Sequence, residues 1–321
     1  MRDQSAQKVR SNRTHRPELV ALVGPTASGK SAVAMAVAER SGDVELISID
    51  SMQVYRHMDV GTAKPTAEEQ SRVRHHLIDL VEPSDEFAVA EFQRAYDDVL
   101  VDLGERGRRA LLVGGTGLYH RAVIDDLDLP GQWPEIRARL EGDAAEFGPE
   151  RLHARLVGID PAAAEKMEPN NARRIVRALE VCEGSGRPFS SFGPGLDDYP
   201  ATPVRQIGLR WDRATLAARI ERRVHAMVDG GLVAEVEAIA GSTGFSKTAA
   251  QALGYKEVLA HLDGDLSLDE AVDQVIVRTR QFAVRQERWF RRDPRVEWVD
   301  VADDPVAEAA PTAAAALGMG V

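Results

Sequence analysis

Short apolar runs alternate with amphipathic stretches through the first 125 positions. The runs at 19–23, 44–49 and 110–113 have the length and unbroken hydrophobicity of buried parallel strands. The segments between them, 31–40 and 85–106, have the residue spacing and composition of helices. Strands that alternate with helices predict an α/β protein with a parallel sheet, whose functional sites lie at the carboxyl ends of the strands.

The pattern changes near position 126. Residues 133–185 are helix-forming and rich in Arg, Glu and Ala, whereas 184–203 is rich in Gly, Ser and Pro and is expected to form loops. A strand pattern returns at 204–211. Further helices are expected at 213–241, 248–262 and 268–291.

A match to the phosphate-binding motif G-x-x-x-x-G-K-[ST] lies between the first strand and the first helix. It consists of Gly24, Pro25, Thr26, Ala27, Ser28, Gly29, Lys30 and Ser31. Backbone amides and the positive end of the helix dipole would surround phosphate oxygens. Lys30 would add a point charge, and Ser31 would ligate Mg²⁺. The motif indicates a chain of phosphates with Mg²⁺ but does not specify ATP.

With this loop in place, the fold class expected is α/β, a P-loop-type parallel sheet core with a helical insertion domain. The core is expected to comprise 18–125 and 204–300, and the insertion 126–203. A basic tail at 1–17, expected to be disordered, and an Ala/Pro-rich peripheral tail at 301–321 complete the chain.

Composition narrows the class further. Hydrophobic residues make up 44% and charged residues 28% of the chain, which is typical of a globular protein. No apolar run reaches the roughly 18 residues that span a bilayer, and the residues at the start of the sequence do not lead us to expect a secretory signal. Cys182 is the only cysteine, which excludes an internal disulfide and fits a reducing cytoplasm; it is expected on the apolar face of a helix.

Two further features lie at strand ends. Asp50 follows the second strand, where its carboxylate would be a general base, an indirect Mg²⁺ ligand or, equally, a helix N-cap. The third strand ends in Gly114-Gly115-Thr116-Gly117, where many ATP hydrolases have a metal-binding Asp. This difference disfavours an ordinary ATPase, and the glycines indicate a close approach of backbone to ligand.

Together these segments resemble the tRNA dimethylallyltransferases, also called tRNA isopentenyltransferases, of the bacterial type. The resemblance covers about 19–300, in the family's order. The segments that carry it are 24–31, Asp50-Ser51-Met52-Gln53-Val54-Tyr55-Arg56, 58–65, 75–79, 113–119, 174–181, 252–257, and Arg280-Gln281 with Arg285-Gln286 and Trp289-Phe290.

The resemblance implies transfer of a dimethylallyl group from dimethylallyl diphosphate to the N6 amine of adenosine 37 in a tRNA anticodon loop. It implies Asp50 as the base, Thr116 near the reacting centre, Arg219 on the diphosphate and Arg223 beside it, with Mg²⁺ as cofactor. The implied tRNA contacts are Asp50, Ser51, Met52, Gln53, Thr116, Arg137, Arg173, Arg174, Arg177, Arg278, Gln281 and Arg285. A cytoplasmic monomer that binds no membrane is expected.

Two departures from the family's pattern occur. The stretch Glu168-Pro169-Asn170-Asn171 stands where the family often has His-Pro-Asn-Asp, so the role of that His and Asp is in doubt. The cysteines and histidines of the eukaryotic zinc finger are missing, which agrees with the bacterial type.

The net charge of −11 argues against a polyanionic partner unless positive charge is concentrated locally. Residues 278–295 hold seven arginines against two carboxylates. Helical spacing places Arg278, Gln281, Arg285, Arg288 and Arg292 on one face, with Arg173, Arg174, Arg177 and Arg187 as a second basic group. We expect unpaired charge here to contact phosphates rather than form only a solvated face.

Three alternatives remain at this point. A small-molecule kinase would use the loop for ATP and the insertion as a lid, but the Gly-Gly-Thr strand end and the basic helix argue against it. An adenylate isopentenyltransferase would use free AMP, ADP or ATP as acceptor, and the basic helix and large insertion disfavour it. A non-enzymatic RNA-binding module would not need a Mg²⁺ loop.

Overall fold

The computed structural model describes residues 18–193 and 195–319, which form two compact units. The first contains the described residues through Ile124 and from Ala201 onward, and the second is Asp125–Pro200. The insertion expected at 126–203 covers almost the same residues as the second unit. The tail expected at 1–17 lies outside the described residues.

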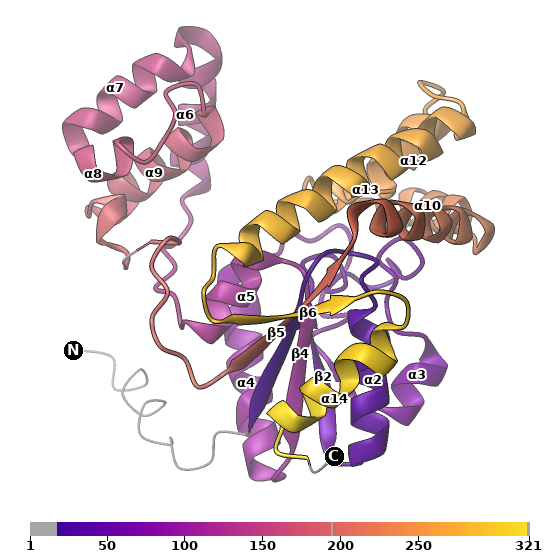
Figure 1. Ribbon diagram of the computed structural model, residues 1–321. Coiled ribbons are helices and arrows are strands. Elements are labelled where there is room, and N and C mark those ends of the chain that lie inside the picture. The colour runs from indigo at the N-terminus through magenta and orange to yellow at the C-terminus, as the bar shows by residue number, and fades with distance from the viewer. Residues whose placement is uncertain (1–17, 194, 320–321) are drawn as a thin grey trace. The chain divides into compact units, whose positions relative to one another are not determined.

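A six-stranded parallel sheet in the order β3-β2-β4-β1-β5-β6 forms the centre of the first unit (Figure 1). Its strands are β1 (Leu19–Val23), β2 (Val44–Ile49), β3 (His75–His76), β4 (Arg109–Gly114), β5 (Arg205–Trp211) and β6 (Val296–Val301). All pairings are parallel, so the carboxyl ends of the strands share one edge. The predicted α/β fold is confirmed.

Helices cover both faces of this sheet, as the unbroken apolar strands require. Val20 and Leu22 of β1 pack into a core with α2 (Lys30–Ser41) and α14 (Pro305–Ala316). Ala21 and Val23 face the opposite side, in a core with α4 (Val89–Glu105) and α5 (Gly117–Ile124). The two cores lie on opposite faces of the sheet and support the strand ends from which the loops begin.

The remaining helices of this unit are α3 (Ala67–Arg72), α10 (Arg213–Asp229), α11 (Leu232–Ala240), the short η3 (Ala249–Gln251), α12 (Tyr255–Leu262) and α13 (Leu268–Arg291). The single helix expected at 213–241 is two helices, because Gly230 and Gly231 separate them and Gly231 adopts a φ of 99°. At the start of α13, Ser267 and Glu270 form a capping box.

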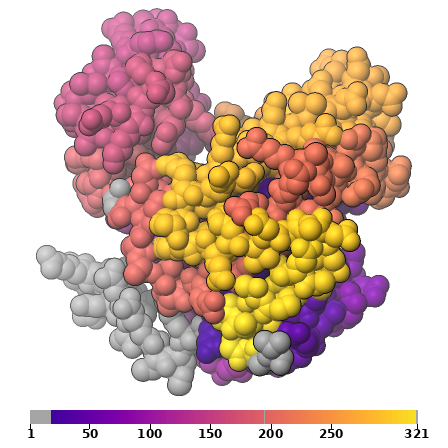
Figure 2. Space-filling view, in the orientation of Figure 1, coloured from indigo at the N-terminus to yellow at the C-terminus, as the bar shows by residue number. Residues whose placement is uncertain are grey.

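The expectation of a peripheral tail at 301–321 is wrong for the described part. Helix α14 is a core element, because the side chains of Ala309 and Ala313 are fully buried against α2 and the sheet. Figure 2 shows the yellow C-terminal segment packed beside the indigo start of the core. A Cβ at Gly29 would lie 2.5 Å from the Pro305 ring, so α14 also supports the phosphate-binding loop.

The second unit has a hydrophobic core of its own. Its helices are α6 (Pro134–Phe147), α7 (Pro149–Ile159), α8 (Pro161–Ala164), α9 (Ala172–Ser185) and the short η2 (Phe189–Ser191). Leu140, Leu156, Ile175 and Leu179 are fully buried in that core. Cys182 is buried with them on the apolar face of α9, as expected.

Within the described ranges, none of the helices combines the length and the apolar character needed to cross a bilayer.

Candidate active site

The phosphate-binding loop connects β1 to α2 at the shared edge of the strand ends. Gly24 adopts a φ of 136°, and a Cβ there would lie 2.8 Å from the Leu209 carbonyl oxygen on neighbouring β5. Only glycine fits this position. Gly29 is the N-cap residue of α2, so the amides of that helix start face the cavity beside the loop.

Three cations converge on this loop. The Lys30 Nζ donates hydrogen bonds to the carbonyl oxygens of Gly24 and Pro25, at 3.0 and 2.7 Å. Arg219 Nε donates to the Ala27 carbonyl at 3.0 Å, and its guanidinium lies 4.2 Å from the centre of the Trp211 ring.

The third cation is the guanidinium of Arg223, which is within 3.3 Å of the Thr26 hydroxyl oxygen. Burial lowers the pKa of both Arg219 and Arg223. Burial, and to a smaller extent the Arg223 charge, lower the pKa of the Lys30 ammonium to about 7, against the opposing effect of Asp50. The three neighbouring cations, only partly offset by the Asp50 carboxylate, make this a site of positive potential.

Asp50 and Thr116 follow the ends of neighbouring strands β2 and β4. Asp50 Oδ1 accepts a hydrogen bond from the Met52 amide at 2.8 Å, and the residues that follow form turns rather than a helix. The N-cap interpretation of Asp50 is therefore wrong. The Thr116 hydroxyl accepts from the Ser51 amide at 3.2 Å, which ties the two strand ends together.

The side chain of Gln53 is held within the protein. Its Nε2 donates to the carbonyl oxygens of Thr62 and Ala63, each at 3.2 Å, and its Oε1 accepts from the Ser48 hydroxyl at 2.7 Å. Both amide hydrogens are thus used, so any tRNA contact at this position would be limited to the acceptor oxygen or the backbone.

A carboxylate that the sequence analysis missed holds the loop that supports Gln53. Glu235 on α11 accepts hydrogen bonds from the amides of Asp59, Val60 and Gly61 at 2.7–3.1 Å. It also accepts from the Tyr255 hydroxyl at 2.6 Å, and burial beside this carboxylate raises the pKa of Tyr255. No local signal identifies Glu235, because the backbone amides that it binds lie more than 170 residues earlier in the chain.

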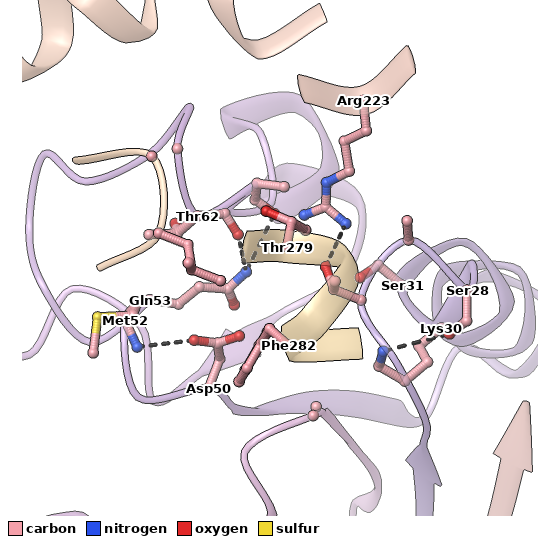
Figure 3. Close-up of a pocket in the computed structure, with 18 of the residues that line it drawn as sticks. Ser28, Lys30, Ser31, Asp50, Met52, Gln53, Thr62, Arg223, Thr279 and Phe282 are labelled. Carbon is pink, nitrogen blue, oxygen red and sulfur yellow. Dashed lines mark hydrogen bonds between the residues drawn. The ribbon is translucent and has the colours of Figure 1, made fainter. Parts of the chain in front are cut away.

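A cavity of about 790 Å³ brings these groups together. Its lining includes Thr26–Ser31 of the loop, the segment Asp50–Gln53, Thr116, and four arginines, Arg219, Arg222, Arg223 and Arg285. The close-up in Figure 3 shows Lys30, Ser31 and Arg223 on one side of the labelled residues, and Asp50, Met52 and Gln53 on the other. Gly24, Pro25, Arg278 and Gln281 do not line it. The sequence analysis missed Thr279, Phe282 and Gln286 of α13 as lining residues.

Fewer arginines of α13 are unpaired than the sequence suggests. The expectation of unpaired arginines over 278–295 is wrong at Arg278 and Arg280, because helices α12 and α10 supply partners for them. These ion pairs are Arg278–Glu257 and Arg280–Glu221. The pairs Arg291–Glu287 and Arg295–Asp293 lie within the segment and use the two carboxylates that the sequence count already included. Gln281, Arg285 and Arg288 remain exposed along the helix.

In the second unit, a fully buried Glu180 organises two of the arginines. It pairs with Arg137 at 2.7 Å and with Arg177 at 3.0 Å, whereas Arg173 and Arg174 are exposed in the first turn of α9. The Asn171 side chain accepts from the Arg174 amide and caps that helix. The departure from the family pattern therefore preserves a helix N-cap.

A parallel sheet with cations gathered on its first strand-to-helix loop places the chain among the P-loop proteins that bind phosphorylated ligands. A family model described as IPP transferase matches residues 53–293. The chain belongs to this family, as its sequence resemblance indicated.

Individual relatives agree with this assignment. A tRNA dimethylallyltransferase from Pseudarthrobacter chlorophenolicus is 49% identical over 298 residues, covering 92% of this chain and 97% of the relative. A crystal structure of the full-length tRNA isopentenylpyrophosphate transferase from Bacillus halodurans has a TM-score of 0.68 and 41% identity, covering 94% and 97% of the two chains. A eukaryotic dimethylallyltransferase described as acting on tRNA has a TM-score of 0.76 and 25% identity, covering 93% and 78%.

Proposed function

We propose that this enzyme transfers the dimethylallyl group of dimethylallyl diphosphate to the N6 amine of adenosine 37 in tRNA anticodon loops, forming N6-isopentenyladenosine. The observation that carries the proposal is one cavity with cations at the phosphate loop and a carboxylate, Asp50, beside them. A leaving diphosphate needs the first feature, and an amine that loses a proton needs the second.

The reaction follows from this arrangement. The bond between the allylic carbon and the diphosphate oxygen breaks, and its electron pair leaves with the diphosphate. Lys30, Arg219 and Arg223 stabilise that charge. The N6 nitrogen forms the new bond to the allylic carbon and gives one proton to Asp50. Thr116 holds the strand end at which Asp50 begins its turn, so the carboxylate keeps its orientation.

The proposed cofactor, Mg²⁺, fits the donor set at the loop. Ser31 lines the cavity with a hydroxyl oxygen, and the substrate would supply diphosphate oxygens, the ligands that Mg²⁺ prefers. Among the described residues, no cluster of three or more His, Cys, Asp or Glu side chains is placed to hold a metal. Held by Ser31 and the diphosphate oxygens, Mg²⁺ would neutralise charge on the leaving group.

Lys30 should take up a proton when the diphosphate binds. Its pKa of about 7 leaves the amine mostly neutral at pH 8, and phosphate oxygens favour the charged form, so binding raises the pKa. Affinity should therefore weaken as the pH rises above 7. Calorimetric titrations at pH 8 in two buffers of different ionisation enthalpy should show uptake of about one proton. Lys30→Met should remove most of that uptake, and wild-type binding without uptake would contradict the assignment.

We further propose that tRNA contacts Arg285 and Gln281 on α13, the backbone at 50–53, and Arg173 and Arg174 of the second unit. These side chains are basic or polar and exposed, the properties of residues that bind backbone phosphates. Arg137, Arg177 and Arg278 are proposed with them, although each also pairs with a buried glutamate.

Arg285→Ala should raise the tRNA KM about 10-fold at moderate salt, because one phosphate contact is lost. The slope of the logarithm of tRNA affinity against the logarithm of salt concentration should become less negative by about 1. Arg205→Ala is the matched control. Arg205 lies at the amino end of β5, away from the carboxyl ends of the strands, and pairs with Glu297. An unchanged KM and an unchanged salt slope in Arg285→Ala would show that Arg285 is exposed to solvent without contacting tRNA.

The function itself is tested by incubating the enzyme with radiolabelled dimethylallyl diphosphate and Mg²⁺ in the presence of tRNA, AMP or ATP. Label in tRNA, recovered as N6-isopentenyladenosine after digestion, supports the proposal. Label only in free nucleotide would instead indicate an adenylate isopentenyltransferase. Because tRNA is the acceptor, we propose that the enzyme works in the cytoplasm, and we expect a monomer, which sedimentation equilibrium tests.

A further inference from the structure

A buried glutamine on α13 connects two parts of the cavity that have separate tasks. Gln286 Oε1 accepts a hydrogen bond from the Thr26 amide at 2.8 Å, and its Nε2 donates to the Gly115 carbonyl oxygen at 3.0 Å. Only 7% of the residue is exposed. The orientation of its amide is determined by its partners, since Thr26 offers an N–H group and Gly115 an oxygen.

The two partners belong to different segments that line the cavity. Thr26 belongs to the phosphate-binding loop after β1, whereas Gly115 immediately precedes Thr116 at the end of β4. These strands are neighbours in the sheet. A single side-chain amide therefore bridges the loop proposed to hold the donor and the turn proposed to face the acceptor.

Helix α13 packs directly against backbone at this turn. A Cβ at Gly115 would lie 2.2 Å from Gln286 Nε2, and a Cβ at Gly117 would lie 2.2 Å from the Trp289 Nε1. Gln286 and Trp289 are one helical turn apart, so the same face of α13 contacts both residues that flank Thr116. Neither glycine leaves room for movement of the helix toward the turn.

We propose that Gln286 is a positioning residue. It sets the separation between the donor diphosphate and the acceptor amine through the two segments that it binds, and it does not need to contact either substrate. The inference rests on the proposed prenyl transfer. In this role Gln286 acts through the Thr26 amide on the donor side, and through the Gly115 carbonyl on the side of Thr116 and Asp50.

The spacing matters because the reacting atoms must approach to about 3–3.5 Å, and a misplacement of about 1 Å can reduce a rate 10²-fold. Removal of Gln286 would also leave the partly buried Thr26 N–H and the buried Gly115 C=O without this partner, which favours rearrangement of the two segments. The change would alter the relative position of donor and acceptor, while the groups that bind each substrate would remain.

Gln286→Met tests this, because methionine fills a similar volume without either hydrogen bond. With both substrates saturating, we expect the single-turnover rate to fall about 10- to 100-fold, with the dissociation constants for dimethylallyl diphosphate and tRNA within about 3-fold of wild type. Gln274→Met is the matched control. It lies on the same helix outside the cavity and should transfer at the wild-type rate.

Gln286→Glu supplies a readout that a merely structural role would not change. An ionised glutamate accepts from the Thr26 amide but repels the Gly115 carbonyl, whereas a protonated one can also donate to it. Burial raises the pKa of such a carboxyl. The transfer rate of Gln286→Glu, divided by the wild-type rate at each pH, should therefore increase as the pH falls.

The outcomes separate clearly. Slow transfer by Gln286→Met with retained binding, together with pH-dependent recovery in Gln286→Glu, supports the inference. A Gln286→Met rate within 2-fold of wild type overturns it, as does a flat rate ratio for Gln286→Glu. If Gln286→Met does not fold, the Gln286→Glu profile decides. If wild-type enzyme moves no label to any acceptor, the proposed function fails and takes this inference with it.

Discussion

Asp50→Asn should lower the rate of prenyl transfer by about 10²- to 10⁴-fold, the usual contribution of a general base. Asparagine has nearly the same shape, and its Oδ1 can still accept the hydrogen bond from the Met52 amide. The turn after β2 should therefore persist while the basic oxygen is lost. The exocyclic amine is a weak nucleophile, since its lone pair is delocalised into the adenine ring, and it depends on proton removal as the new bond forms.

The measurement is the single-turnover rate with both substrates saturating, accompanied by tRNA affinity. Asp50→Asn should bind tRNA with little change, because the effect falls on the chemical step. Asp50→Ala, which also loses the hydrogen bond to Met52, should be at least as slow. A rate for Asp50→Asn within about 3-fold of wild type would remove Asp50 as the base.

Lys30→Met should slow transfer by about 10²- to 10³-fold, which corresponds to the roughly 2.7–4 kcal/mol that one preorganised electrostatic contact contributes. The lysine amine donates hydrogen bonds to two carbonyl oxygens of its own loop and makes a long contact of 3.4 Å to the Ser28 hydroxyl. When the diphosphate leaves with an additional negative charge, this ammonium stabilises it directly.

The thermal stability of Lys30→Met should not fall with its activity. Burial lowers the pKa of Lys30 to about 7. Keeping this group in the folded protein therefore lowers the free energy of unfolding rather than raising it. The melting temperature of Lys30→Met without substrate should therefore equal or exceed that of wild type, while activity falls. Calorimetry of both proteins at pH 7 checks this. A large loss of stability would mean that Lys30 holds the loop together instead of serving the substrate.

The sequence predicted the elements whose signals are local. The buried strands, the loop at 24–31 and the long amphipathic helix at 268–291 each show their type within a few residues, through apolar runs or helical spacing. The position of Asp50 at a strand end followed from the same reasoning, because parallel strands end at one edge.

Features that depend on distant partners could not be predicted in this way. Strand β6 has polar residues at Glu297 and Asp300 because it is an edge strand, which hides its apolar pattern. Helix α14 is rich in Ala and contains Pro311, a composition that does not distinguish a small-residue core helix from a tail.

The same limit applies to the site. Glu235 and Gln286 act on backbone groups more than 170 residues away, and backbone amides leave no trace in the sequence. Counting arginines over 278–295 overstated the free charge, because Glu257 and Glu221 reach α13 from other helices. In each case the missing information is three-dimensional proximity, which no local pattern encodes.

Prenyl transfer as proposed requires that the loop at 24–31 binds the diphosphate of a prenyl donor. The most direct measurement is a crystal structure with Mg²⁺ and an unreactive thio analogue of dimethylallyl diphosphate. We predict diphosphate oxygens within hydrogen-bonding distance of the loop amides, Lys30 and Arg219, with the allylic carbon directed toward Asp50. An empty loop under these conditions, in a protein that instead binds ATP there and hydrolyses it, would contradict the account.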